Sequence, residues 1–226
     1  MNDILQGLDL RFVETEHALS ALKSYMTTME NEVHGLYAKE LNSVVRPANA
    51  DEEEVSLYFD ERQWVEDHFQ DDFVPMMRYS FIVFLHTILE DHLRRFCNHV
   101  HKEKGLSLKV SDLRGESPID RSKIFLGKLA GFDIAAITQW QSLQDFQKVR
   151  DCIVHSSGFT GPMTEKTKSR LQEMIKQDAD LTLNRDDRLI PSIAFCRRHL
   201  EAVEGFFHGL FAQVGWKPYT PKALPF

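Results

Sequence analysis

The chain has 226 residues, 42% hydrophobic and 27% charged, which fits one well-filled globular domain or one domain with a helical extension. Phenylalanine is abundant at 16 residues against 11 glycines, and this balance favours a core of helices over a turn-rich β fold. The net charge of −7 argues against general electrostatic attraction to nucleic acid, although an acidic chain can still bind RNA through a local basic patch.

The cysteines and the apolar runs of the sequence indicate the cellular compartment of the protein. Cys97, Cys152 and Cys196 lie far apart in apolar contexts, so we expect reduced core thiols rather than disulfides or zinc ligands. The amino-terminal stretch MNDILQGLDL lacks the apolar region of a signal peptide, and the longest apolar run, Phe81 to Leu85, is far too short to span a bilayer. The sequence therefore predicts a cytoplasmic protein with no membrane partner.

The first predicted element, from Leu8 to Val45, is one long helix or two abutting ones, and its apolar residues repeat at helical spacing. Its apolar stripe is narrow, as in a helix that packs against a single partner helix. That partner belongs either to the same chain or to a second subunit. After Pro47, the acidic run Asp51 to Glu54 is typical of a solvated helix start, and a short helix is expected from Val55 to Phe69.

Pro75 is expected to open the most hydrophobic helix, because proline is tolerated in the first helical turn. Apolar residues cover more than one face of this helix, which indicates a central position or an oligomer interface. Lys104 and Gly105 supply the basic charge and the glycine cap that are typical of a helix end. A further helix is predicted to start at Pro118 and to stop at Gly131.

The next helix begins near Ile134 and runs through the segment Phe146 to Gly158, FQKVRDCIVHSSG, where Ser-Ser-Gly stops it. Another helix is expected from Thr164 to Lys176, followed by a small β-hairpin within Leu181 to Ile190. A last helix follows from Pro191 to Val214. The sequence thus predicts an all-α protein of roughly six or seven helices with a small C-terminal β-hairpin.

The sequence contains no phosphate-loop, dinucleotide-binding, zinc-protease or serine-hydrolase motif. His99 and His101 would point about 200° apart on a helix, which makes a poor metal chelate, so no metal or cofactor is predicted. Arg150 and His155 remain as candidates for chemistry. An Arg followed by a His after four to six residues arises by chance roughly once or twice in a chain of this composition, so spacing alone identifies nothing.

The neighbouring residues distinguish Arg150 and His155 from the other Arg–His pairs in the chain. Asp151 lies one helical turn before His155, so its carboxylate can orient the imidazole and favour the protonated ring. Ser156 to Gly158 place His155 in the last turn, where exposed carbonyls act in the same direction. Arg150 and His155 point about 140° apart on a regular helix. They can reach one substrate only if the helix end distorts or if a second copy of the motif lies opposite.

The run R-D-C-I-V-H followed by SSG, with the upstream stretch SFIVFLHTILEDHLRRFC, resembles the HEPN superfamily of all-helical proteins. Many members are RNases in toxin–antitoxin, abortive-infection and CRISPR-linked systems. The resemblance covers roughly Val74 to Val214. It implies a HEPN-like helical domain at 73–215, with an N-terminal helical extension at 1–72. The tail at 216–226 carries three prolines and is expected to be flexible.

The resemblance identifies Arg150 and His155 as a catalytic pair. Asp151 takes the polar position, where family members more often have Asn, and it adds negative charge near a bound phosphate. Glu90 is the acidic residue of the upstream helix. Its role is either catalytic or a structural bond to Arg150.

The activity implied by the resemblance is metal-independent RNA cleavage, in which the ribose 2′-OH attacks the adjacent phosphate. His155 would transfer protons and Arg150 would stabilise charge on the phosphorane oxygens. Lys166, Lys168 and Arg170 would hold the RNA backbone, unless they are only a solvated helix face.

The resemblance also implies partners. Two motifs would face each other across a homodimer, through the helices that carry Phe81 and Phe146. A cognate antitoxin or a defence partner protein would regulate the enzyme. The alternative is a non-catalytic HEPN-like helical protein that dimerises or binds a partner and cleaves nothing.

Overall fold

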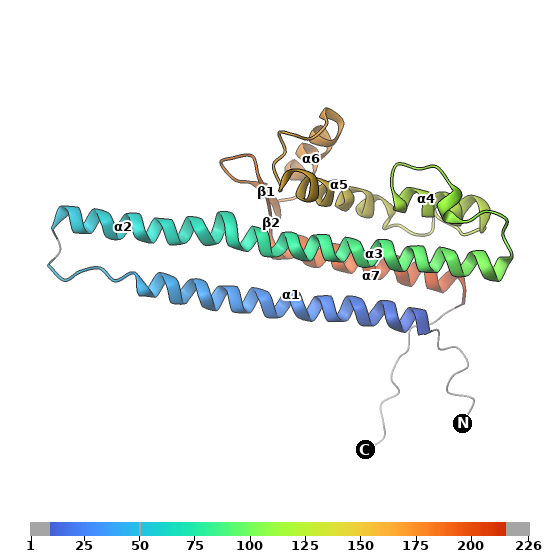
Figure 1. Ribbon diagram of the computed structural model, residues 1–226, viewed down its shortest axis with the longest axis horizontal. Helices are drawn as coiled ribbons and strands as arrows, with labels where there is room; N and C mark the ends of the chain where they lie inside the picture. The colour runs from blue at the N-terminus through green and yellow to red at the C-terminus, as the bar shows by residue number, and fades with distance from the viewer. Residues whose placement is uncertain (1–9, 50, 216–226) are drawn as a thin grey trace, which may run out of the picture. The chain divides into compact units, whose positions relative to one another are not determined.

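The structure is a computed structural model that describes residues 10–49 and 51–215. These residues form an all-α fold with a small two-stranded sheet, as the sequence predicts (Figure 1). The tail expected at 216–226 lies outside the described residues. In chain order the elements are α1 (Leu10–Ser43), α2 (Glu52–Asp67), the π-helical η1 (His68–Phe73), α3 (Val74–Lys104), the 3-10 turn η2 (Val110–Asp112), α4 (Pro118–Ile124), the π-helical η3 (Phe125–Leu129), α5 (Trp140–Ser156), α6 (Glu165–Gln177), β1 (Leu181–Leu183), β2 (Leu189–Pro191) and α7 (Ile193–Gln213).

Two compact units make up the chain, and each combines stretches that are distant in sequence. The boundary expected at residue 72 matches neither unit, because α1 and α3 each contribute residues to both. The described residues of unit 1 are 10–21, 84–147 and 197–215, and those of unit 2 are 22–49, 51–83 and 148–196.

One continuous helix runs from Glu52 to Lys104, although the sequence predicts a break before Pro75. The predicted break is wrong because η1 is wound as a π-helix, in which the Val74 N–H donates to the carbonyl of Phe69. A π turn disturbs the usual ladder of hydrogen bonds, so a proline without an N–H can follow it without ending the helix. The acidic run before this helix is a helix start, as expected, since Asp51 and Glu54 form a reciprocal capping box.

The helix Glu52–Lys104 is also long and apolar enough to cross a membrane by length and composition. Its most apolar window is 44% buried inside the protein. The core helix of a soluble protein meets the same criterion, so this feature leaves the location in the cell open.

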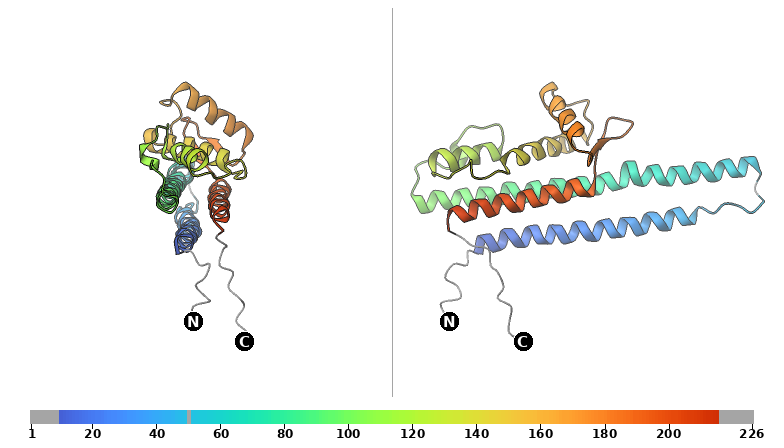
Figure 2. Two further views of the ribbon diagram at one scale, coloured as in Figure 1. Left: turned by 90° about the vertical axis from the view of Figure 1, so that its right-hand side faces the viewer. Right: turned by 180° about the vertical axis from the view of Figure 1, so that it is seen from behind.

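In unit 2, α1 runs beside α2 and packs its apolar stripe against it (Figure 2). Val33 and Val44 share a buried cluster with Val65 and Phe69. Of the two partners that the sequence allowed for this stripe, a helix of the same chain is the one that the structure shows.

A buried ion pair joins α1 to α3 within unit 2. Arg78 donates from Nε to Glu30 Oε1 at 2.7 Å and from Nη2 to Oε2 at 3.0 Å. Its Nη1 also donates to the carbonyl of Pro191 in β2 at 3.1 Å. Because the pairing is bidentate and the Glu30 side chain is buried, it fixes the register of the two helices against each other.

Unit 1 has a core of phenylalanines from several helices. The ring of Phe211 in α7 meets Phe12 of α1 with centroids 4.7 Å apart and Phe96 of α3 at 5.3 Å, and both contacts are edge-to-face. Phe96 also contacts Phe132 at 5.6 Å. These contacts confirm that the abundant phenylalanines build a helical core.

The cysteines are free thiols, and all of them are buried, as the sequence predicts. Burial raises the pKa of Cys97 and of Cys196 to about 12. The pKa of Cys152 is raised by burial as well. The thiols therefore stay protonated and serve as small apolar core groups.

Candidate functional site

The predicted catalytic motif lies at the carboxyl end of α5, and its residues belong to unit 2. Cys152 and Ile153 face the core, Arg150 is half-buried and His155 is exposed. The helix is regular through Ser156, so Arg150 and His155 keep the separation of about 140° that ideal geometry gives. The helix end thus does not bring the two side chains together, and a second copy is the remaining way to combine them.

The carboxylate of Asp151 contacts its neighbour Arg150 and not His155. Arg150 Nη1 donates to Asp151 Oδ1 at 2.9 Å. Within the described part of the chain, Asp151 and His155 form no hydrogen bond or ion pair, so the expected contact is not made. A permanently charged guanidinium competes effectively for an adjacent carboxylate, which accounts for the difference.

The guanidinium of Arg150 has hydrogen-bond donors that its contact with Asp151 does not use. Its Nε is buried and has no hydrogen-bond partner among the residues that the structure describes. A buried donor without a partner is energetically costly. Arg150 is therefore held in place by Asp151 on one side and has unused hydrogen-bonding capacity on the other.

Glu90 lies in α3 and belongs to unit 1. On its own helix its carboxylate is 3.6 Å from Nδ1 of His86, one turn earlier. Arg150 belongs to unit 2, so both roles predicted for Glu90, catalytic and structural, stay predictions.

The loop after His155 ends the helix with two residues in left-handed backbone conformations, Ser157 at φ 53° and Gly158 at φ 87°. The Gly158 N–H donates to the carbonyl of Cys152 at 3.1 Å, which closes the helix in the manner of a Schellman motif. The hydroxyl of Ser156 lies 2.7 Å from the carbonyls of both Cys152 and Phe159. The Ser-Ser-Gly run is thus a structural stop.

Two residues that sequence reasoning missed, Tyr79 and Arg188, hold this loop in place. The Tyr79 hydroxyl donates to the carbonyl of Leu189, and burial raises the pKa of Tyr79 to about 12. Arg188 donates to the carbonyl of Ser157 at 3.2 Å and to Asp72 Oδ1 at 3.2 Å. Its guanidinium also lies over the Tyr79 ring, 5.3 Å from the centroid. These partners are distant in sequence, and no local pattern predicts the contacts.

The three cations predicted to bind RNA lie in the first half of α6. Lys166 is exposed and Lys168 is half-buried. Arg170 donates to Glu173 at 3.0 Å. Residues two apart on a helix point about 200° apart, so Lys168 faces away from Lys166 and Arg170. The three side chains do not form one continuous basic strip, and their binding of RNA stays a prediction.

Exposed apolar side chains flank His155. Val154 is 46% exposed and Phe159 is 39% exposed. Phe81 and Phe146, which mark the helices predicted to form the dimer, are both buried in the core of the single chain. Any contact between two copies at the motif would therefore use Val154 and Phe159 rather than those two phenylalanines.

Comparison of the chain with protein-family models, with characterised proteins and with solved structures finds no match. The resemblance to HEPN proteins therefore depends on the motif and its upstream helix. Among the described residues, no group of three or more His, Cys, Asp or Glu side chains is placed to hold a metal ion.

Proposed function

We propose that the chain is a metal-independent endoribonuclease of HEPN type that acts as a two-fold homodimer in the cytoplasm. The observation that carries the proposal is the exposed His155 in the last turn of a regular helix, between the exposed Val154 and Phe159. An exposed imidazole can reach substrate, and exposed apolar neighbours fit contact with a second copy. The angle between Arg150 and His155 then requires each active site to combine residues of both copies.

In this site, His155 of one copy accepts the proton of the ribose 2′-OH as the oxygen attacks phosphorus. Arg150 of the other copy stabilises the charge that develops on the phosphorane oxygens. The bond to the 5′-oxygen breaks, and that oxygen takes a proton from water. The products carry a 2′,3′-cyclic phosphate and a 5′-hydroxyl.

The ion pair with Asp151 leaves Arg150 able to take part, because it uses Nη1 and leaves other donors of the guanidinium. Asp151 acts as a positioning residue that fixes the direction of the guanidinium. Its negative charge lowers affinity for the phosphate, so Lys166 on the exposed side of α6 contributes to holding the RNA backbone. A toxin–antitoxin or antiviral-defence module, with a cognate antitoxin or partner protein, is the setting that we propose for this activity.

Incubation of the purified protein with RNA in excess EDTA tests the proposal. We expect cleavage that yields 2′,3′-cyclic phosphate ends, because the nucleophile belongs to the substrate. RNA with 2′-O-methyl groups and DNA of the same sequence should stay intact, since both lack the 2′-OH. Cleavage that requires a divalent metal ion, or that occurs equally in DNA, would contradict the mechanism.

A non-catalytic helical protein that dimerises or binds a partner protein is the second candidate. The Arg150–Asp151 ion pair and the contacts of the Ser157–Gly158 loop favour it, because they give the motif a structural role without RNA. This function predicts a stable dimer or complex and no RNA cleavage with or without metal ions.

A further inference from the structure

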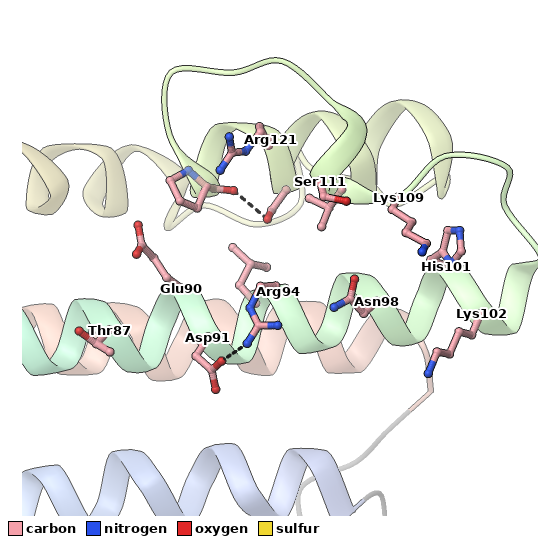
Figure 3. Close-up of a pocket in the computed structure, with 14 residues that line it drawn as sticks. Thr87, Glu90, Asp91, Arg94, Asn98, His101, Lys102, Lys109, Ser111 and Arg121 are labelled. Atoms are coloured by element: carbon pink, nitrogen blue, oxygen red, sulfur yellow. Dashed lines mark hydrogen bonds and ion pairs between the residues drawn. The ribbon is translucent and has the colours of Figure 1, made fainter.

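A pocket of about 720 Å³ lies within unit 1, and none of its lining residues belongs to the α5 motif (Figure 3). One side is a face of α3, and the other consists of the segment around η2 and the start of α4. In Figure 3, Arg121 lies on the α4 side, while Glu90, Asn98 and His101 rise from α3. Most of the residues that line the pocket are polar or charged, and they come from both sides.

The charge of the lining is opposite to that of the chain. Four cations line the pocket, Arg94, Lys102, Lys109 and Arg121, against two carboxylates, Glu90 and Asp91. The lining thus carries a formal charge of 4 − 2 = +2, whereas the whole chain carries −7. A concave cationic site in an acidic protein concentrates small anions locally.

Among the residues that the structure describes, three of these cations, Lys102, Lys109 and Arg121, have no acidic partner. Asp91 is occupied, because both Arg94 and Arg95 pair with it. Lys109 and Arg121, by contrast, form no ion pair with any residue that the structure describes, and His101 beside them forms none either. Their charges are available to a ligand.

Local structure holds both cations toward the pocket. A Cβ at Gly115 would lie 2.8 Å from Cγ of Arg121, so the loop packs closely on the stem of this side chain. The backbone N–H of Lys109 donates to Asp112 Oδ2 at 2.9 Å, which fixes the turn that presents Lys109 and Ser111. This anchoring lowers the entropy lost when the side chains bind an anion.

Glu90 gives the pocket a second, acidic subsite. Its carboxylate can accept hydrogen bonds from hydroxyl or amine groups, while Arg121, Lys109 and His101 donate to an anion. A pocket of this volume has the size of a typical small-molecule site. We infer that it binds a small phosphorylated molecule whose phosphate contacts Arg121 and Lys109 and whose hydroxyl groups face Glu90.

RNA is the less suitable occupant. An extended backbone would run beyond the pocket over a protein of net charge −7, whereas a small ligand experiences only the local cationic field. The inference does not depend on the ribonuclease activity, because the pocket lies in unit 1 and the test is a binding measurement.

Isothermal titration of the full chain with ribose 5-phosphate, inorganic phosphate, ribose and a short oligouridylate tests this inference. Ribose 5-phosphate should bind most tightly, inorganic phosphate more weakly, and ribose not measurably. Arg121→Gln should weaken ribose 5-phosphate binding by about tenfold to a hundredfold, the usual effect of losing a charge-assisted hydrogen bond. Lys123→Gln is the matched control, because it removes one positive charge from the same helix outside the pocket lining and should leave affinity unchanged.

Each other outcome would overturn the inference. Equal losses in both variants would indicate non-specific charge attraction, and no binding of either phosphate would remove the site. Equal affinity for phosphate and ribose 5-phosphate would exclude the subsite at Glu90. If only the oligouridylate bound, and Arg121→Gln weakened that binding, the pocket would be part of an RNA surface. Urea unfolding of Arg121→Gln, compared with the unchanged chain, shows whether its fold is intact.

Discussion

His155→Ala is expected to lower the initial rate of RNA cleavage in EDTA about a thousandfold, because it removes the base that accepts the 2′-OH proton. Arg150→Ala should cause a loss of about a hundredfold to a thousandfold, because it removes the donor that stabilises the phosphorane. Both losses should appear in the catalytic step more than in RNA affinity. Single-turnover cleavage and RNA binding, measured on the same proteins, separate the two effects.

His17→Ala is the matched control for the histidine. His17 is exposed on α1, far from the motif in sequence, and its substitution should leave the rate unchanged. If His155→Ala cleaved RNA as fast as the unchanged chain, His155 would be no more than a residue at a helix end. The proposed chemistry would then be wrong.

Gly158→Ala is expected to destabilise the protein by about 4 kcal/mol, the sum of two costs. The first is backbone strain, since Gly158 has φ 87°. The second is a steric clash, because a Cβ at this position would lie 2.7 Å from Cζ of the buried Tyr79 and closer still to its hydroxyl. Tyr79 cannot move aside without losing its hydrogen bond to Leu189. Urea unfolding measures the change.

Gly161→Ala is the control for this prediction, because the same loop has nothing within 4 Å of the added Cβ. Its unfolding free energy should change by less than about 1 kcal/mol. Adding Tyr79→Phe to Gly158→Ala should recover part of the loss by removing the hydroxyl. Equal stability of Gly158→Ala and Gly161→Ala would show that the loop does not pack on Tyr79 as described.

Much of the fold follows from local patterns in the sequence. The apolar repeat of α1, the hairpin pattern within Leu181 to Ile190 and the Ser-Ser-Gly stop each predict an element that the structure contains. Each of these signals acts between residues that are close in sequence, and such signals are readable without tertiary information.

Other features could not be read from the sequence. No composition rule marks the π-helical η1, so the sequence alone predicts a helix start at Pro75. The division into two units depends on contacts between stretches that are distant in sequence. The contacts of Arg188 with Asp72 and Tyr79 also join residues that are distant in sequence.

In the candidate site, too, some features follow from local sequence signals and others do not. The helix-end position of His155 follows from local capping signals. Local capping signals do not show, however, that the Asp151 carboxylate pairs with Arg150 and not with His155. The pocket at Arg121 has no sequence signal, since its lining comes from α3, η2 and α4 together.

In the ribonuclease that we propose, each active site combines Arg150 of one copy with His155 of the other. Mixing the inactive variants Arg150→Ala and His155→Ala under conditions that exchange subunits tests it directly. Half of the dimers are then mixed, and each contains one complete pair of the two, so about a quarter of the original cleavage activity should return. If differently tagged subunits form mixed dimers and no activity returns, the two copies do not share an active site and the proposed ribonuclease mechanism is wrong.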